Sequence, residues 1–299
     1  MVDPLPRISI VTPSYNQAQF LPETIASVFS QNYPNLEYVI IDGGSTDGSQ
    51  EIVRSFDKSL SYWVSEPDQG QYDAINKGFS HTSGEIMAWI NSDDKYTPWA
   101  LRVVAEIFLR FPHVHWLTTL YPLAWDERGL AVECYPRQGY SRASFFRGEY
   151  LPGAVAGWHT TGSIQQESTF WRRSLWDQAG GTVDKSLQLA GDFELWARFY
   201  KLAELYGIGT PLGGFRRQKN QKTVLYMEKY ARECEQVLRL HGGRPYGKLE
   251  TMIRSRFFRF IPKPVKRRLR LERLIKVCLH IPNEGWRIVD SRDVHFMNQ

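Results

Sequence analysis

Short apolar segments that end in polar clusters alternate with amphipathic segments along the first 120 residues of the chain. The strand-like segments are rich in β-branched residues and lie at 7–12, 37–41, 60–64, 85–90 and 115–120. The amphipathic segments repeat apolar residues at helical spacing and lie at 20–30, 72–80 and 99–110. Parallel strands are joined by crossovers that usually contain a helix, so this alternation predicts an α/β fold. We expect a Rossmann-like, mostly parallel central sheet with helices on both faces.

The regular alternation stops after residue 120. Residues 135–165 are rich in glycine, aromatic residues and arginine, and they show little periodicity. Long irregular segments of compact domains are often functional, so we expect a recognition surface there. Helical spacing returns at 170–178, 192–205 and 223–240.

Polar clusters follow three of the predicted strands, at Pro13–Asn16, Asp42–Asp47 and Asn91–Asp94. Ligands of open α/β sheets bind beyond the carboxyl ends of the strands. The sequence therefore predicts that a binding site forms where these three clusters meet.

Two adjacent carboxylates, Asp93 and Asp94, follow the apolar strand at 85–90. Such a pair is repulsive unless water or a cation neutralises it, and carboxylates are the oxygen ligands that Mg²⁺ and Mn²⁺ prefer. A polar turn that leads into the next helix would use the same residue types. On the residues alone, metal binding and turn formation both remain open.

Three further residues each have a structural and a functional interpretation. Asp42 ends an apolar strand before two glycines, where a carboxylate could hold a turn or accept a hydrogen bond from a ligand. Tyr15 could pack at the rim of the sheet or stack on a planar base. Asp192 begins an amphipathic helix, so it could be the helix cap or a carboxylate that takes up a proton.

The composition excludes several other classes of protein. The chain has 42% apolar and 14% aromatic residues, which suffices for a core and excludes a disordered chain. It contains no run of about 18 apolar residues that would span a membrane. Residues 1–7 lack the features of a secretory signal, so we expect a cytoplasmic protein. The three cysteines form no CxxC pair and no HExxH motif is present, so zinc is not predicted.

Positive charge is concentrated near the C-terminus. Residues 254–276 contain ten Lys or Arg and one Glu, a net +9, so the rest of the +5 chain carries −4. Phenylalanine and leucine are interleaved with these charges, which favours a basic amphipathic segment on an anionic membrane surface. A solvated helix packed on the body of the protein remains the alternative. No nucleic-acid-binding module is recognisable, so we expect no nucleic-acid partner.

Taken together, several segments resemble the inverting glycosyltransferases of family 2, which have the GT-A fold. The resemblance runs through ISIVTPSYN (8–16), EYVIIDGGSTDGS (37–49), GQYDAINKG (70–78), EIMAWINSDD (85–94), ESTFWRRSLWDQAGG (167–181) and GDFELWARF (191–199). Each segment alone is a weak signal, but their order along roughly residues 7–223 is that of the family.

The resemblance implies a GT-A domain over residues 1–223, with a donor half at about 1–120 and an acceptor half at 121–223. Residues 224–299 would form a helical C-terminal extension that contains the basic membrane-surface segment 254–276. The irregular segment 135–165 would then carry the acceptor surface.

The resemblance also implies a set of site residues. Nucleotide or donor contacts would come from Pro13, Tyr15, Asp42, Asp73 and Asp93. Asp94 would bind Mg²⁺ or Mn²⁺ on the diphosphate, and Asp192 would be the general base.

Two positions depart from the family pattern. Many relatives carry an acid before the base aspartate, where this chain has Gly191, and a histidine where this chain has Gln218. A glutamine is a poorer metal ligand than a histidine, which puts the metal dependence in question. Around it, the basic residues Arg216, Arg217, Lys219 and Lys222 could steady a diphosphate or form a solvated loop.

The function implied is that of an inverting hexosyltransferase, which would transfer a sugar from a UDP-linked or similar nucleotide donor to an acceptor hydroxyl. The acceptor would be a lipid-linked surface glycan of the cell envelope, and the protein would lie on the inner face of the cell membrane. Two alternatives remain open. A nucleotidylyltransferase would need a glycine-rich basic loop at the first strand end, where this chain has Pro13–Asn16. A carbohydrate- or membrane-binding protein could retain the fold without catalysis.

Overall fold

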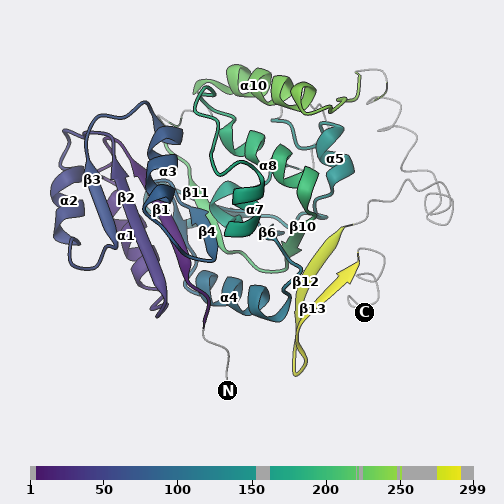
Figure 1. Ribbon diagram of the computed structural model, residues 1–299, viewed down its shortest axis with the longest axis horizontal. Helices are drawn as coiled ribbons and strands as arrows, with labels where there is room; N and C mark the ends of the chain where they lie inside the picture. Colours follow the sequence, from purple (N-terminus) through teal and green to yellow (C-terminus); the bar gives the residue numbers. More distant parts are fainter. Residues whose placement is uncertain are drawn as a thin grey trace.

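The computed structural model describes residues 5–152, 162–219, 221, 225–247, 250 and 275–290. In this part of the chain, a large sheet contains β1 (Ile8–Ser14), β2 (Leu36–Asp42), β3 (Tyr62–Ser65), β4 (Ile86–Trp89), β6 (Trp116–Thr119), β9 (Phe170–Arg172), β10 (Leu205–Ile208), β12 (Lys276–Ile281) and β13 (Gly285–Asp290). Its nine strands lie in the order β13-β12-β10-β6-β9-β4-β1-β2-β3, and most neighbouring pairs are parallel. The predicted α/β class is confirmed (Figure 1).

A smaller sheet and a set of helices complete the described structure. The smaller sheet has the order β5-β11-β7-β8, formed by Lys95–Tyr96, Gly213–Arg216, Leu123–Trp125 and Ala131–Cys134. The helices are α1 (Leu21–Phe29), α2 (Ser49–Ser55), α3 (Gln71–Ser80), α4 (Ala100–Arg110), α5 (Arg142–Phe146), α7 (Arg173–Gln178), α8 (Gly191–Leu202) and α10 (Met227–Leu240).

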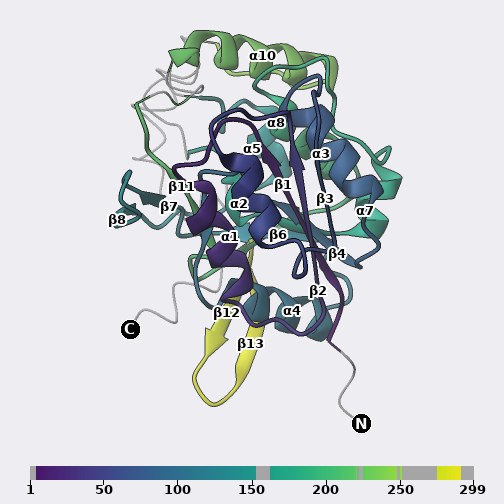
Figure 2. The same ribbon diagram turned by 90° about the vertical axis from the view of Figure 1, so that its left-hand side faces the viewer.

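Helices cover both faces of the large sheet, as the apolar strand β2 requires. Tyr38 and Ile41 of β2 are both buried and point to opposite faces, because side chains alternate along a strand. Tyr38 packs edge-on against Phe29 of α1, with ring centroids 5.4 Å apart. On the other face, a Cβ atom added to Gly78 of α3 would lie 2.4 Å from Val11 and 3.3 Å from Ile41. Only glycine allows α3 to approach the sheet this closely, and Figure 2 shows β1–β3 between α1 and α3.

The register of the sheet brings the polar strand ends to one edge. Ser14 at the end of β1 lies opposite Asp42 at the end of β2. Trp89 of β4 lies opposite Val11, so Asn91–Asp94 follow at the same edge. The predicted meeting of the three polar clusters is therefore present in the structure.

Tryptophans attach α8 to the middle of the large sheet. Trp196 of α8 stacks on Trp116 of β6 and on Trp89 of β4, with ring centroids 5.5 and 6.1 Å apart. Trp171 of β9 packs edge-on against Trp89 at 5.4 Å. All four indoles are buried, which makes this the most densely aromatic part of the core and fixes the position of α8.

The C-terminal part differs from the predicted helical extension at residues 276–290. Lys276–Ile281 and Gly285–Asp290 form an antiparallel hairpin, and β12 pairs in parallel with β10 of the large sheet. Its turn contains Asn283 and Gly285, both with positive φ, and the buried Val277 and Cys278 join the core. The basic segment 254–276 lies outside the described residues except for Ile275 and Lys276. In the described part, no helix combines the length and apolar character needed to cross a membrane.

Candidate functional site

A cavity of about 690 Å³ opens where the three polar clusters meet. Its wall includes five of the residues predicted from the sequence, namely Pro13, Tyr15, Asp93, Asp94 and Asp192. None of the described residues in the range 135–165 contributes to the wall, and residues 153–161 of that range lie outside the described part of the chain. Gln188, Leu189 and Tyr230, which come from beyond that range, also line the cavity.

Hydrogen bonds between neighbouring turns shape the end of the cavity formed by β1 and β2. The backbone N–H of Asn16, which has a φ of 51°, donates to Ser45 Oγ at 2.8 Å. Asn16 Oδ1 in turn accepts from the N–H of Thr46 at 2.9 Å. Tyr15 next to this link is 62% exposed, so its ring is available to a planar ligand at the rim.

The structure does not place Asp42 or Asp73 on the cavity wall. Asp42 is fully buried and accepts hydrogen bonds from the N–H and hydroxyl of Ser45 and from the hydroxyl of Ser65, at 2.5–2.9 Å. Its carboxylate therefore holds the turn that presents Gly43, which does line the cavity. Asp73 in the first turn of α3 forms an ion pair with Lys185 at 3.2 Å.

Asp94 is the most buried carboxylate of the cavity, and backbone and amide donors hold both of its oxygens. Oδ1 accepts from the backbone N–H of Arg216 at 2.8 Å, and Oδ2 accepts from Asn91 Nδ2 at 2.9 Å. Burial, together with the charges of Asp93 and Glu167, raises the pKa of Asp94 well above its usual value. A positive charge placed beside this group would relieve that cost.

Oxygen ligands are available here for a divalent cation, but the protein supplies few of them. Among the described residues, no group of three or more His, Cys, Asp or Glu side chains converges closely enough to hold an ion. Mg²⁺ is commonly held by one or two carboxylates together with substrate phosphates. Asp93 and Asp94 fit that donor set, with the remaining ligands left to a phosphorylated substrate and water.

The basic stretch that begins at Arg216, the last residue of β11, is only partly available to such a substrate. The Arg216 guanidinium is fully buried and donates to the carbonyl of Asp93 at 2.7 Å and to Glu23 Oε2 at 2.5 Å. Arg217 forms an ion pair with Glu133. Gln218 Nε2 donates to Asp93 Oδ2 at 2.5 Å and lines the cavity. Arg216 therefore supports the acidic pair from behind, while Lys222 lies outside the described residues.

Asp192 lies in the first turn of α8, and the N-cap of this helix is Ala190. The capping interpretation left open by the sequence therefore does not apply. Asp192 Oδ1 accepts from the N–H of Phe193 at 2.7 Å, whereas burial raises the pKa of the carboxyl to about 6. A carboxylate with a pKa just below neutrality is charged at pH 7 and still able to accept a proton.

Glu167 is a cavity residue that the sequence patterns did not single out. It lies in a 3₁₀ turn (Gln166–Ser168) beside β9, hydrogen-bonds Asp94, and lines the cavity. Burial, and then the charges of Asp192 and Asp93, raise its pKa to about 7. Its place within the segment that resembles the family was the available signal, but one glutamate in a motif does not reveal which side chains it faces.

Comparison with sequence profiles of protein families matches residues 9–158 to "Glycosyl transferase family 2". An uncharacterised glycosyltransferase of Rickettsia prowazekii is 25% identical over 202 residues, which is 67% of this chain and 61% of that protein. The chain thus spans about three fifths of the length of this curated relative.

Two solved structures share the fold. S. aureus TarS 1-349 in complex with UDP-GlcNAc superposes with a TM-score of 0.58 at 15% identity, covering 87% of this chain and 77% of that one. The mannosyltransferase PcManGT from Pyrobaculum calidifontis, in complex with GDP-Man and Mn²⁺, superposes with a TM-score of 0.53 at 16% identity, covering 90% and 80%. At these identities the likeness establishes the architecture and not the substrate.

Proposed function

This chain belongs to glycosyl transferase family 2 and has the GT-A fold, and we propose that it transfers a sugar from a nucleotide-diphosphate donor to an acceptor hydroxyl. The observation that carries the proposal is the presence, in one cavity, of an acidic pair at a strand end, of which Asp94 is buried, and a separate carboxylate with a pKa of about 6. Loss of a diphosphate and deprotonation of a hydroxyl need these two kinds of group at one reacting carbon.

The donor nucleotide would bind at the end of the cavity formed by β1 and β2. Pro13 and Tyr15 would contact the base, and Asp93 would face the ribose or the sugar. Asp42 would act indirectly by holding the turn at Gly43, and Asp73 by its ion pair with Lys185. A uridine nucleotide is supported by the UDP-GlcNAc complex of TarS, whereas the GDP-Man complex of PcManGT makes guanosine the second base to test.

Asp94, with Asp93 beside it, would hold Mg²⁺ or Mn²⁺ on the diphosphate. The cation would offset the negative charge that develops on the leaving group. Gln218 occupies the place of a family histidine, and its amide donates a hydrogen bond to Asp93 Oδ2. Gln218 would therefore orient the Asp93 carboxylate, and the carboxylates alone would bind the cation. The burial of Asp94 and the Mn²⁺ in the PcManGT complex support this part of the proposal.

Asp192 would remove the proton of the acceptor hydroxyl as the oxygen attacks the anomeric carbon. Bond formation by the acceptor and departure of the diphosphate would occur in a single displacement, which inverts that carbon. The acceptor would enter between Asp192 and the wall formed by Gln188, Leu189 and Tyr230, because these residues belong to the segment that leads into α8 and to the helix packed on it, and not to the strand ends of the donor half.

We place the acceptor on a lipid-linked glycan of the cell envelope and the protein on the inner face of the membrane. The mixture of basic and aromatic residues in 254–276 supports this placement. Sedimentation of the whole chain with anionic vesicles, compared with a chain truncated before Arg254, tests it: equal sedimentation would contradict a membrane role for the segment.

The test of the catalytic proposal is nucleotide release from a panel of UDP-, GDP- and dTDP-linked hexoses, with Mn²⁺ and with a chelator. Water can replace the acceptor hydroxyl in such an assay, so no acceptor has to be known. Cation-dependent release that is lost in Asp192→Asn would support transfer. A protein that binds nucleotide but releases none from any donor would be a binding protein that retains the fold.

A further inference from the structure

Helix α10 lies beyond residue 223, the predicted end of the GT-A domain, yet it packs directly on the helix that carries Asp192. Figure 1 shows α10 in light green lying across α8. The face of α10 that contacts the body is buried and apolar, with Cys234, Val237 and Leu238 in the core. Tyr230 on the same helix lines the cavity. The predicted boundary at residue 223 therefore separates two parts of one cavity wall.

A single carboxylate oxygen on α10 binds the segment that leads into α8. Glu233 Oε2 accepts three backbone N–H groups, from Gln188 at 3.3 Å, Leu189 at 2.9 Å and Ala190 at 3.1 Å. A second contact joins the same two elements, because Lys229 donates to the side-chain oxygen of Gln188. Consecutive N–H groups that converge on one anion form a charge-assisted cluster, which is stronger than isolated neutral bonds.

These bonds replace the local cap that α8 lacks. The N-cap residue, Ala190, has no side chain that can accept a hydrogen bond. The next N–H group, that of Gly191, donates to the hydroxyl of Tyr72 on α3 at 2.9 Å, and the N–H of Phe193 donates to Asp192 itself. The donors of residues 188–191 are thus satisfied from two other helices, α10 and α3, and these helices fix the position of Asp192 at the start of α8.

We propose that Glu233 is a positioning residue for Asp192, which it holds at the cavity by anchoring residues 188–190. This inference rests on the proposed function, in which Asp192 is the general base. A base must stand within hydrogen-bond reach of the acceptor hydroxyl, and a displacement of about 1 Å can cost on the order of 10²-fold in rate. Glu233 contacts neither the donor end nor the acidic pair, so its removal should affect the chemical step and spare nucleotide binding.

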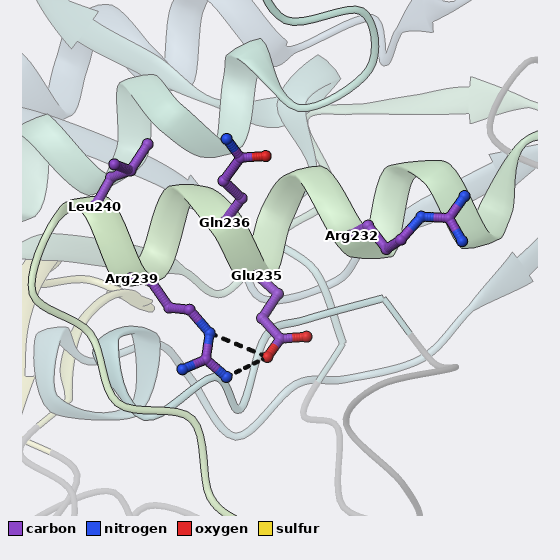
Figure 3. A pocket seen from close by; sticks show the side chains of 5 residues that line it. All are labelled: Arg232, Glu235, Gln236, Arg239 and Leu240. Atoms are coloured by element: carbon purple, nitrogen blue, oxygen red, sulfur yellow. Dashed lines mark hydrogen bonds and ion pairs between the residues drawn. The ribbon is translucent and has the colours of Figure 1, made fainter.

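The same helix provides a matched control. Glu235 lies two residues from Glu233, is half-buried, and pairs with Arg239 on the same helix at 2.5 Å (Figure 3). Residues two apart on a helix do not share a face. Glu235→Ala therefore removes the same charge from the same helix without touching residues 188–190.

The experiment compares Glu233→Ala, Glu233→Gln and Glu235→Ala for nucleotide release from the most active donor of the panel. We expect kcat to fall about 10-fold or more in Glu233→Ala, with the donor KM and the affinity for the nucleotide diphosphate unchanged. Glu233→Gln should fall less but still measurably, about two- to threefold, because its amide oxygen can accept the three N–H groups but lacks the charge that strengthens these bonds. Glu235→Ala should match the wild type. Unchanged kcat in Glu233→Ala would overturn the proposal, and if that variant does not fold, an unchanged kcat in Glu233→Gln would do so.

A second comparison separates positioning from general structural support. In an Asp192→Asn background, Glu233→Ala should lower the residual release by less than about twofold, because the group that it positions is already gone. An equal loss in both backgrounds would assign Glu233 to structure alone.

Amide exchange at residues 188–190 requires no substrate, so it tests the anchoring role of Glu233 separately from the proposed transfer function. Faster exchange in Glu233→Ala than in Glu235→Ala supports the anchor, and equal exchange overturns it. A chain that releases no nucleotide from any donor contradicts the proposed function instead, whatever the exchange shows.

Discussion

The donor end of the cavity is formed by the turns that follow β1 and β2, and the end that carries Asp192, the proposed general base, is called the base end below. The two ends are held in place by different means. At the donor end, Asp42 binds Ser45 three residues later, and Asn16 binds the adjacent turn, so short loops at neighbouring strand ends fix one another. At the base end, the start of α8 is held by Tyr72, which lies 119 residues earlier in the chain, and by Glu233 on α10. The donor end is thus assembled by local turn chemistry, and the base end by long-range packing.

This difference predicts which step of the reaction a substitution at each end should affect. A substitution in the donor turns should weaken binding of the nucleotide. A substitution around α8 should leave binding intact and slow the chemical step. Three variants and one change of pH test this contrast, in decreasing order of expected effect.

Asp192→Asn should have the largest effect on turnover. The amide keeps the shape of the side chain but cannot take a proton, so kcat should fall roughly 10²–10⁴-fold, the usual contribution of a positioned base. Nucleotide binding, followed by calorimetry with Mn²⁺, should stay as in the wild type. Turnover close to that of the wild type would leave the general base unidentified. It would also contradict the expectation that the region around α8 governs the chemical step.

Asp94→Asn should lower both turnover and nucleotide binding. It removes the buried charge that would face the cation, so turnover should fall on the order of 10²-fold, and the Mn²⁺-dependent part of nucleotide binding should weaken. Asp177→Asn, an exposed substitution of the same kind on α7, is the matched control. Near-normal activity in Asp94→Asn would remove Asp94 from the metal site.

The same difference explains what the sequence could and could not predict. The strand ends were predictable because a β-branched run followed by DGGS or NSDD signals a turn through local chemistry. Asp192 was recognised from a motif, but its supports Tyr72 and Glu233 were not, because no local pattern records a contact across 40 or more residues.

Two structural predictions from the sequence are wrong, for different reasons. Phe170–Arg172 has helical spacing with the residues that follow, yet it forms β9, antiparallel between β4 and β6. Burial of Phe170 and Trp171 in the sheet overrides the local preference. The β12–β13 hairpin, in contrast, has a local signal in its β-branched runs and the PNEG turn, which the prediction of a helical extension does not take into account.

Gly191→Ala should strain the base end with little effect on the donor end. An added Cβ would lie 2.6–2.8 Å from three ring atoms of Tyr72, so either the ring or the start of α8 must move. We expect a loss of about 1–3 kcal/mol in the free energy of unfolding and about a tenfold fall in kcat. Gly247→Ala, where an added Cβ meets nothing within 4 Å, is the control. The same crowding explains why an acid at this position would not fit here. A Gly191→Ala protein as stable and active as the control would show that Tyr72 does not constrain α8.

The smallest expected effect is the pH dependence near neutrality, and it tests the base end without any substitution. Burial raises the pKa of Asp192 to about 6, so half of the base is protonated at that pH, and kcat should fall about twofold there and about tenfold for each further unit below. Glu167, with a pKa of about 7, could produce a similar limb, and the Glu167→Gln variant distinguishes the two. If the limb near pH 6 persists in Glu167→Gln, Asp192 is its source. If it disappears, the titrating group is Glu167.

The free energy of unfolding should depend on pH in the opposite sense to kcat. Because the folded state holds the Asp192 proton more tightly than the unfolded state, this group contributes stability at low pH that is lost as pH rises through about 6. Asp192→Asn should therefore melt at a higher temperature than the wild type above pH 6 and show no such advantage near pH 4. A lower melting temperature for Asp192→Asn at neutral pH would contradict this expectation. It would mean that the charged carboxylate of Asp192 itself stabilises the start of α8.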